Sequence, residues 1–325
     1  MSVSANLLAN PGVLRLMKSR LYPAVFQAAG AAVFVLIIFQ LVAGPEAAHD
    51  NLGTALTWVA WWPLIPIIFV IAGRFWCAIC PFGTLNDVVQ KYVGLKRPVP
   101  QFLKTYGIWI IDALFILITW SDHVWGIVES PWGSGVLLLL LTSGVVVSGA
   151  LYERRTWCRF LCFLGGLSGN YARAGAVSLR ADQSICKTCT ARAACFNGSP
   201  DGKIPGCPMF EFPRLMDTNA RCTLCANCVK ACPNGAITLT VQPPTRELWF
   251  IKKPKLEEAF LAIVIMGIVF VQNITMLEVW KGILTSLEGI TGTTSYVVNF
   301  TITFLIAMAF PVALLGIAAV IARRF

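Results

Sequence analysis

The residues best suited to chemistry are cysteines, and eight of the twelve in this 325-residue chain lie between positions 186 and 232. The first group contains Cys186, Cys189, Cys195 and Cys207. The second group contains Cys222, Cys225, Cys228 and Cys232. Deprotonated cysteine is a soft ligand that suits zinc, copper(I) and iron-sulfur clusters. So many thiols in one short stretch therefore predict a metal-binding region.

The spacing of the second group indicates which metal. It follows the pattern C-x2-C-x2-C-x3-C-P, in which the first three thiolates hold one [4Fe-4S] cluster and the proline-followed fourth ligates a neighbouring cluster. Cys207 is also followed by a proline. Exchanging the two proline-followed cysteines predicts two ligand sets. Cluster one takes Cys186, Cys189, Cys195 and Cys232, and cluster two takes Cys222, Cys225, Cys228 and Cys207.

Zinc and disulfides are the alternatives for these thiols. Zinc often recruits histidine, but the only two histidines, His49 and His123, lie far from this stretch. Disulfides form in oxidising compartments, whereas the charge pattern described below places the stretch in the cytoplasm. Two [4Fe-4S] clusters are therefore our prediction.

The remainder of the chain has the composition of a membrane protein. It is 57% hydrophobic and 13% charged, with a mean hydropathy of +0.70, whereas soluble proteins carry about a quarter charged residues. A spanning helix needs about 20 apolar residues. Six stretches meet this need, at 24–43, 53–72, 106–121 with extension at both ends, 134–152, 259–280 and 295–321. We expect an α-helical integral membrane protein with an inserted two-cluster, ferredoxin-like α+β domain.

These stretches divide the chain into four parts. Residues 1–22 form an N-terminal segment, either a helix lying on the membrane surface or a plain positively charged flank. Residues 23–165 hold four spans, 166–256 the ferredoxin-like domain, and 257–325 the last two spans.

Charge predicts the orientation. With six spans, all 26 Lys and Arg residues except Lys281 fall on one side, including Arg323 and Arg324 at the C-terminus. Positive residues concentrate on the cytoplasmic side of membrane proteins. The sequence therefore predicts a bacterial-type cytoplasmic (inner) membrane protein in contact with lipid, with both termini and the cluster domain in the cytoplasm. The net charge of +10 follows from this topology and requires no nucleic-acid partner.

The remaining four cysteines occur in two similar turns, after the second and fourth spans. Each turn opens with Arg-x-Trp-Cys, at Arg74 and Arg155, and the cysteines are Cys77, Cys80, Cys158 and Cys162. The repetition indicates a tandem repeat of helical hairpins, which would bring the two pairs face to face. Three interpretations stay open: a third iron-sulfur or metal centre, two redox-active dithiols, and cysteines packed as small hydrophobes.

The twin turns followed by a two-cluster insert resemble a family of membrane polyferredoxins. Its members include the NapH subunit of periplasmic nitrate reduction, the C-terminal half of NosR, and the oxidase-assembly protein CcoG (RdxA). The resemblance covers roughly residues 20–250. These families usually show C-x3-C-P in both turns, whereas here two residues separate Cys77 from Cys80 and Phe163 replaces a proline. The resemblance implies electron transfer linked to the quinone pool, within or beside a larger respiratory complex.

Physical reasoning leads to the same class of function. All predicted centres lie on one side of about 30 Å of hydrocarbon, so a membrane quinone is the natural partner for electrons arriving there. Asp112, an acid within the third span, is either a quinone and proton site or the ion-pair partner of Arg74 or Arg155. His49 and His123 are either exposed loop residues or the two ligands of a haem.

The main hypothesis is an electron-transfer subunit that links a cytoplasmic redox partner to the quinone/quinol pool. Its partners would be other subunits of a membrane complex, such as a dehydrogenase, a reductase or a cytochrome. The first alternative is an assembly or maturation factor that supplies electrons for metal or cofactor insertion into another enzyme. The second is a redox-sensing scaffold. The sequence contains no nucleotide-binding or hydrolytic motif, so substrate chemistry would belong to a partner.

Overall fold

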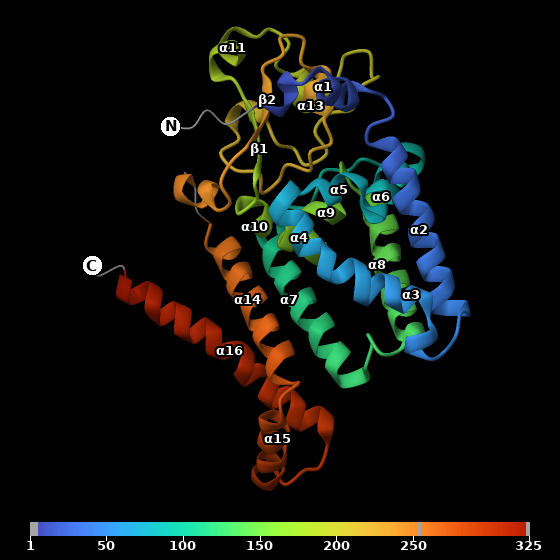
Figure 1. Cartoon of the computed structure of the whole chain (residues 1–325), viewed down its shortest axis with the longest axis vertical. Coiled ribbons are helices and arrows are strands. Elements are labelled where there is room, and N and C mark those ends of the chain that lie inside the picture. The colour runs from blue at the N-terminus through green and yellow to red at the C-terminus, as the bar shows by residue number, and fades with distance from the viewer. Residues whose placement is uncertain (1–5, 252–254, 323–325) are drawn as a thin grey trace.

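The computed structural model describes residues 6–251 and 255–322, so Arg323 and Arg324 lie outside the described residues. A helical bundle carries a smaller cysteine-bearing domain on one end (Figure 1). Six of the described helices are long and apolar enough to cross a membrane, which confirms the predicted number. They are α2 (Ala24–Ala43), α3 to α4 (Leu52–Ala72), α7 (Gln101–Trp125), α8 (Pro131–Leu151), α14 (Leu256–Ile274) and α16 (Tyr296–Ala322).

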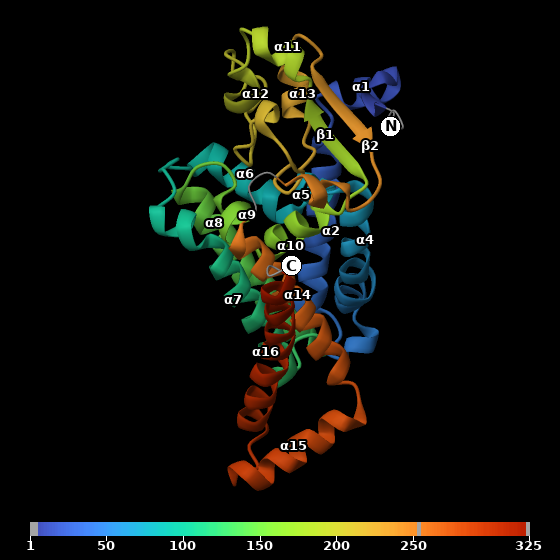
Figure 2. The same cartoon turned by 90° about the vertical axis from the view of Figure 1, so that its left-hand side faces the viewer.

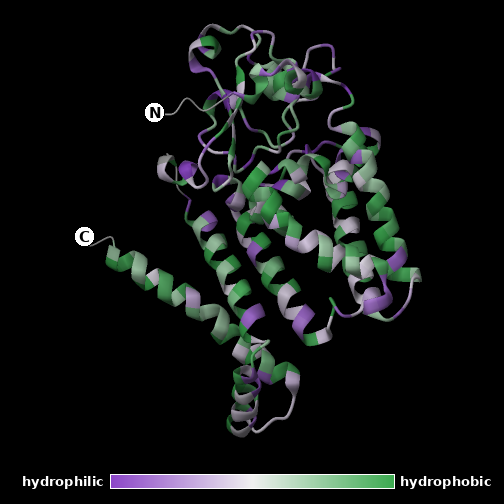
Figure 3. Cartoon of the chain, viewed as in Figure 1, coloured by the Kyte–Doolittle hydropathy of each residue, from purple (hydrophilic) through white to green (hydrophobic). Residues whose placement is uncertain are grey.

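Apolar residues cover the outside of this bundle. Figure 3 shows hydrophobic residues along much of the long helices and a mixture of hydrophilic and hydrophobic residues in the cysteine-bearing domain. The first half of α16 packs on α14 through Phe300, Phe304 and Met308. Beyond Pro311 large apolar side chains of α16, such as Ile317 and Val320, are exposed. Such a surface is what hydrocarbon would cover.

The second span is not a uniform α-helix. It runs from α3 (Leu52–Thr54) through a π-helical segment, η3 (Ala55–Trp61), to α4 (Trp62–Ala72). The Trp62 N–H donates to the Thr57 carbonyl five residues back, and the next residue, Pro63, has no N–H to donate. A π turn is wider than an α turn and is frequently found at functional sites. It changes the face on which the tryptophans of this segment lie.

The fifth predicted span, 259–280, was wrong at its C-terminal end. Helix α14 ends at Ile274, and a separate helix, α15 (Glu278–Thr291), begins after a short turn. The Thr275 hydroxyl donates to the Gln272 carbonyl 3.1 Å away, and the Leu277 N–H to the Ile274 carbonyl at 3.0 Å, which ends the helix. In Figure 2, α15 lies across the end of the bundle opposite the cysteine-bearing domain.

The cysteine-bearing domain is built on a two-stranded antiparallel sheet. Strand β1 (Val177–Ala181) pairs with β2 (Ile237–Val241), with Val177 opposite Val241. Between and around these strands lie α11 (Gln183–Thr188), α12 (Ala194–Asn197), η4 (Pro213–Leu215), α13 (Asn227–Ala231) and η5 (Arg246–Phe250). Leu179, Val229 and Leu239 are buried in its core.

The N-terminal segment is helical, as one of its two predicted roles requires, and it packs on this domain. It consists of η1 (Leu7–Ala9) and α1 (Pro11–Lys18). Met17 is 5% exposed and lies in the same core as α13. The Tyr22 hydroxyl donates to the Leu224 carbonyl at 2.6 Å. Part of the apolar face of α1, centred on Met17, is therefore buried against protein, whereas Leu16 is 52% exposed.

The predicted boundary between residues 165 and 166 falls inside a helix, α10 (Phe163–Arg173). Helix α10 packs on α4, α7 and α14, so the bundle extends to Arg173. The first of the twin turns includes the short helix α5 (Phe75–Ile79), which precedes α6 (Pro81–Val93). The second includes α9 (Thr156–Phe160), which precedes α10. The bundle also contains η2 (Ala48–Asp50).

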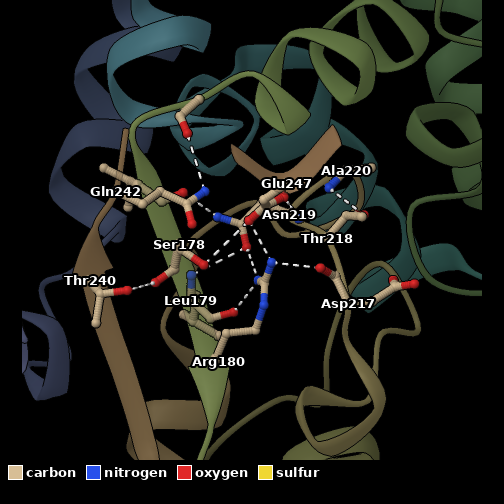
Figure 4. Close-up of polar contacts among 12 residues, drawn as sticks. Ser178, Leu179, Arg180, Asp217, Thr218, Asn219, Ala220, Thr240, Gln242 and Glu247 are labelled. Carbon is tan, nitrogen blue, oxygen red and sulfur yellow. Dashed lines mark hydrogen bonds and ion pairs between the residues drawn. The ribbon is translucent and has the colours of Figure 1, made fainter. Parts of the chain in front are cut away.

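A buried polar network joins β1 to the chain just before the second cysteine run (Figure 4). Glu247 is 4% exposed, pairs with Arg180 and accepts the Asn219 N–H at 2.7 Å. The Asn219 side chain accepts from the Leu179 N–H at 3.2 Å and from Arg180 at 2.6 Å. These bonds fix the position of Cys222, three residues after Asn219.

Replacing Glu247 should therefore loosen the domain. Glu247→Ala leaves the Arg180 guanidinium and the Asn219 N–H without their acceptor, at an expected cost of about 2–4 kcal/mol. Thermal unfolding should occur at a lower temperature, and a chelator should bleach the visible absorption faster. Asp201→Ala is the control, because Asp201 is exposed and its contacts are to nearby Ser199 and Lys203, outside this network. Equal bleaching rates for the two variants would contradict this role of the network.

Candidate iron-sulfur centres

The four cysteines predicted for cluster one line a single pocket. Cys186 and Cys189 lie at α11, Cys195 in α12, and Cys232 directly after α13. The sheet makes this possible, because the Asp182 N–H at the start of α11 donates to the Ala236 carbonyl at 2.8 Å. A residue 37 positions after Cys195 is thus brought beside it.

Burial and the neighbouring thiols raise the pKa of two of these cysteines, Cys186 and Cys195. Burial, followed by the neighbouring Cys232, Cys186 and Cys189, raises the pKa of Cys195 to about 11. Hydrogen-bond donors also face the sulfurs, since the Asn234 amide lies 3.3 Å from Cys189 Sγ and the Ala236 N–H 3.3 Å from Cys232 Sγ. Metal binding would deprotonate the thiols, and N–H···S bonds adjust the potential of a bound cluster.

The cysteines predicted for cluster two are likewise near one another. Burial raises the pKa of Cys222 to about 12. A backbone hydrogen bond lowers this pKa, whereas the neighbouring Cys225 and Cys207 raise it further. Burial, followed by Cys225, raises the pKa of Cys207 to about 11. Leu224 and Ala226 take positive φ angles of 55° and 63°. These reversals of the chain let closely spaced cysteines face one centre.

A single ion and a [4Fe-4S] cluster need different arrangements of their ligands. In the residues that the structure describes, no three His, Cys, Asp or Glu side chains converge closely enough to hold one metal ion. A [4Fe-4S] cluster binds its four thiolates at four different irons, so its ligands need not converge on a point. The donor sets, each of four thiols, match that requirement.

The twin turns also face each other. Cys77 lies in α5 and Cys158 in α9, whereas Cys80 and Cys162 directly precede α6 and α10. Burial raises the pKa of Cys158. Arg155 lowers this pKa, and the neighbouring Cys162, Cys80 and Cys77 raise it. Burial, followed by Cys80 and Cys77, raises the pKa of Cys162 to about 12. Four thiols therefore share one region, as a third centre would require.

A buried arginine holds the two turns together. Arg155 is 2% exposed, pairs with Asp87 at 2.6 Å and donates to the Cys77 carbonyl at 2.6 Å. A glycine follows each cysteine pair where the backbone is crowded, Gly165 within its own turn and Gly83 against Arg155 of the other turn. A Cβ atom at Gly165 would lie 2.5 Å from the Cys158 carbonyl oxygen, and one at Gly83 only 3.1 Å from Arg155.

Asp112 is buried, at 3% exposure, and neither carboxylate oxygen has a hydrogen-bond partner. Arg155 pairs with Asp87 and Arg74 donates to the Ala220 carbonyl, so the predicted ion pair with either arginine is not formed. Its role as a quinone or proton site stays a prediction.

The structure does not bring the two histidines together. His49 lies in η2 with its side chain 82% exposed and pairs with Asp50. His123, near the end of α7, stacks on Phe300 at 5.5 Å and lies 3.5 Å from the Thr275 hydroxyl. This arrangement does not support a haem held by both residues.

A large cavity, which the sequence did not reveal, opens beside the twin turns. Its volume is about 440 Å³, within the range of small-molecule sites. Apolar residues of α4, α7, α8 and α10 form most of the wall, and Cys162 and Trp157 line it. Its polar groups include Thr57, Trp61, Thr119, Asp122 and His123. No sequence pattern marks it, because its lining comes from six separate segments.

Two polar atoms in this wall have no partner. The Thr57 hydroxyl and the Trp61 indole N–H are buried and make no hydrogen bond. By contrast, the Trp58 indole donates to the Ser134 hydroxyl at 2.8 Å. The Trp61 ring lies 5.6 Å from Trp76, the residue before Cys77. The cavity thus offers free hydrogen-bonding groups next to the first cysteine turn.

The exchanged ligand sets can be tested by single replacements. Cys232→Ala should remove cluster one, although Cys232 belongs to the second cysteine run, and Cys207→Ala should remove cluster two. Each variant should lose about four irons and four sulfides per chain, because one [4Fe-4S] cluster is lost. Electron paramagnetic resonance of the reduced protein should show that the two variants lose different signals. Loss of the same signal from both would contradict the exchange.

Comparison with known proteins supports the cluster chemistry. A family described as a 4Fe-4S binding domain matches residues 54–100 and 134–180, each of which contains one of the twin turns. A second family with the same description matches residues 218–238, the second cysteine run. No solved structure matches the chain.

Two curated relatives are distant. YccM of Escherichia coli (strain K12), whose name proposes electron transport as its role, is 23% identical over 63% of this chain and 60% of its own length. The uncharacterized protein MJ0749 of Methanocaldococcus jannaschii is 27% identical over 54% of this chain and 67% of its own. Together with the cysteine arrangement, these matches support an iron-sulfur protein with 4Fe-4S binding regions that is similar to a protein whose name proposes electron transport.

Proposed function

We propose that this protein carries single electrons between a soluble cytoplasmic partner and quinone dissolved in the membrane, as part of a larger respiratory complex. The observation that carries the proposal is the cavity of about 440 Å³ that adjoins the twin cysteine turns. The resemblance to NapH, NosR and CcoG and the role proposed in the name of YccM support it. The positive-inside rule supports a cytoplasmic position for the cluster domain.

The proposal requires an ordered path of centres, and two neighbouring arginines support one. Arg154 donates to the Cys207 carbonyl at 3.3 Å, and Arg155 to the Cys77 carbonyl at 2.6 Å. Adjacent residues therefore contact a ligand of cluster two and a cysteine of the twin turns. Cluster two would lie next to the membrane, with cluster one beyond it.

Cluster one is the better contact for a soluble partner. Its ligands Cys186 and Cys189 lie on α11, whose residues are mostly exposed at the far end of the domain (Figure 1). Burial, followed by Cys222, Cys225, Cys207 and lastly Cys195, raises the pKa of Cys228, so the two ligand sets are neighbours. Electrons entering at cluster one could thus reach cluster two directly.

The twin turns would hold a third [4Fe-4S] cluster. Its four thiols are contributed pairwise by the two halves of the repeat, and Arg155 compensates part of the negative charge of a bound cluster. Iron-sulfur clusters supply one-electron transfer, and the protein sets their potential through charge, hydrogen bonds and solvent exposure. The chain's own contribution here is to fix both turns and exclude water around them.

The cavity would then receive the quinone ring. Trp61 and Thr57 offer unpartnered donors to its carbonyl oxygens, and aromatic side chains flank the space. Oxidation of a quinol releases two electrons and two protons. The electrons would pass to the twin-turn centre one at a time, and Asp122 and His123, which line the same cavity, could exchange the protons.

The third centre predicts an iron count. The intact protein should contain about twelve irons per chain, and Cys158→Ser about eight, because each cluster holds four. Ser168→Ala is the control, since Ser168 lies 3.4 Å from Cys77 Sγ but supplies no thiolate. Eight irons in the wild type, with oxidation removing two hydrogens per cysteine pair, would instead support the dithiol interpretation.

The quinone site predicts a contrast between two tryptophans. Trp61→Phe keeps an aromatic ring but removes the free indole donor, so the KM for a soluble quinone analogue should rise about tenfold. Trp58→Phe is the matched control, because Trp58 lines the same cavity but its indole is already bonded to Ser134. Reoxidation of the reduced clusters by the analogue, followed in a stopped-flow spectrometer, measures both.

Equal KM values in the two variants would contradict the assigned quinone position. If reduced clusters react with no quinone analogue at all, the electron-transfer proposal fails in its quinone part. Transient rather than stoichiometric association with a metalloenzyme would then favour the assembly factor.

A further inference from the structure

A second pocket lies where the cysteine-bearing domain meets the bundle, and arginines dominate its lining. It is enclosed by α7, α9, α10 and the start of α14. Its guanidinium groups belong to Arg74, Arg159, Arg173 and Arg221, against one lining carboxylate, Glu258. Ile108, Ile111 and Leu261 form an apolar side.

Several of these guanidinium nitrogens lack partners. Arg74 is 3% exposed, and although its Nη1 donates to the Ala220 carbonyl at 2.6 Å, its Nε and Nη2 make no hydrogen bond. Arg159 Nη1 and Arg173 Nε are also buried without a partner. Buried donors are normally satisfied, and leaving a charged one unpaired is costly.

Existing carboxylates do not neutralise this group. Glu258 pairs with Arg173, and Arg221 lies 3.9 Å from Glu211. Within the described residues, no carboxylate lies within 4 Å of Arg74 or Arg159. Two of the four guanidinium groups in the pocket, those of Arg74 and Arg159, therefore have no carboxylate partner among the described residues.

The internal repeat explains why Arg74 is unpaired. Its counterpart Arg155 pairs with Asp87, which is seven residues after Cys80. The position seven residues after Cys162 is Gly169, which carries no carboxylate. A Cβ atom at Gly169 would lie 3.8 Å from Arg74 Nη1. Gly169 is therefore close to Arg74 but has no side chain that could pair with it. The second half of the repeat thus lacks the carboxylate that Asp87 supplies in the first half.

We propose that this pocket binds a phosphate group, which supplies the acceptor oxygens that Gly169 does not. Guanidinium groups match phosphate oxygens in charge and fork geometry. The phosphate could be the head group of an anionic lipid or a free phosphate ion. Basic pockets between membrane helices on the cytoplasmic side suit lipid head groups, and Ile108 and Leu261 would contact an acyl chain.

The intact protein, reconstituted with its clusters, allows a direct test. Native mass spectrometry should show phosphatidylglycerol retained about tenfold more strongly than phosphatidylethanolamine, and Arg159→Gln and Arg221→Gln should each remove most of that preference. Lys203→Gln is the matched control, because it removes one exposed charge of the same domain outside the pocket. Equilibrium dialysis with inorganic phosphate tests the free ion. Competition by phosphate alone identifies a phosphate-ion site, and retention of lipid in its presence identifies a lipid site.

Gly169→Asp provides a second variant that restores the carboxylate of the repeat. It should lower binding of either phosphate source about tenfold, with an iron content equal to that of the wild type as evidence of folding. Two results would overturn the proposal. One is equal retention of both lipids together with no phosphate binding. The other is a changed electron paramagnetic resonance signal of the twin-turn centre in Arg159→Gln, with lipid and phosphate binding unchanged. The arginines would then act on the cluster rather than on a phosphate.

Discussion

The buried guanidinium of Arg155 is the interaction on which the arrangement of the centres depends. It joins Asp87 of α6 to the Cys77 carbonyl. Its neighbour Arg154 donates to the Cys207 carbonyl of the cysteine-bearing domain. A buried charge is tolerated only when its hydrogen bonds are satisfied, so these partners cannot separate at low cost. Both turns and the cluster domain are therefore held in one relative position, which short electron-transfer distances require.

Much of the fold could be predicted, because the predictive signals are local. Hydropathy located the six apolar helices, and cysteine spacing grouped Cys186, Cys189, Cys195 and Cys232, which line one pocket. Two segments could not be assigned in this way. The apolar face of α1 resembles that of a membrane-surface helix, and only the tertiary structure shows that Met17 packs against α13. The turn after Ile274 depends on side-chain hydrogen bonds within an otherwise apolar stretch.

The cavity could not be predicted for a different reason. Its wall combines residues of the π-helical segment, α7, α8, α10 and the end of α14, each unremarkable in its own stretch. The π turn changes which residues of the second span face inward, and no periodicity argument anticipates that shift. Asp112 stood out in the sequence because an acid within an apolar span is rare. It nevertheless does not line the cavity, whereas Asp122, ten residues further along the same helix, does.

The two halves of the repeat have the same framework but different electrostatics. Each supplies an arginine, a tryptophan and two cysteines. Their surroundings are not symmetric, because Asp87 satisfies Arg155 whereas Gly169 leaves Arg74 bonded only to the Ala220 carbonyl. Arg74 therefore joins the first turn to the cluster domain, and Arg155 joins the two turns to each other. The repeat supplies four thiols in one region, and the difference at one position gives the two arginines different structural roles.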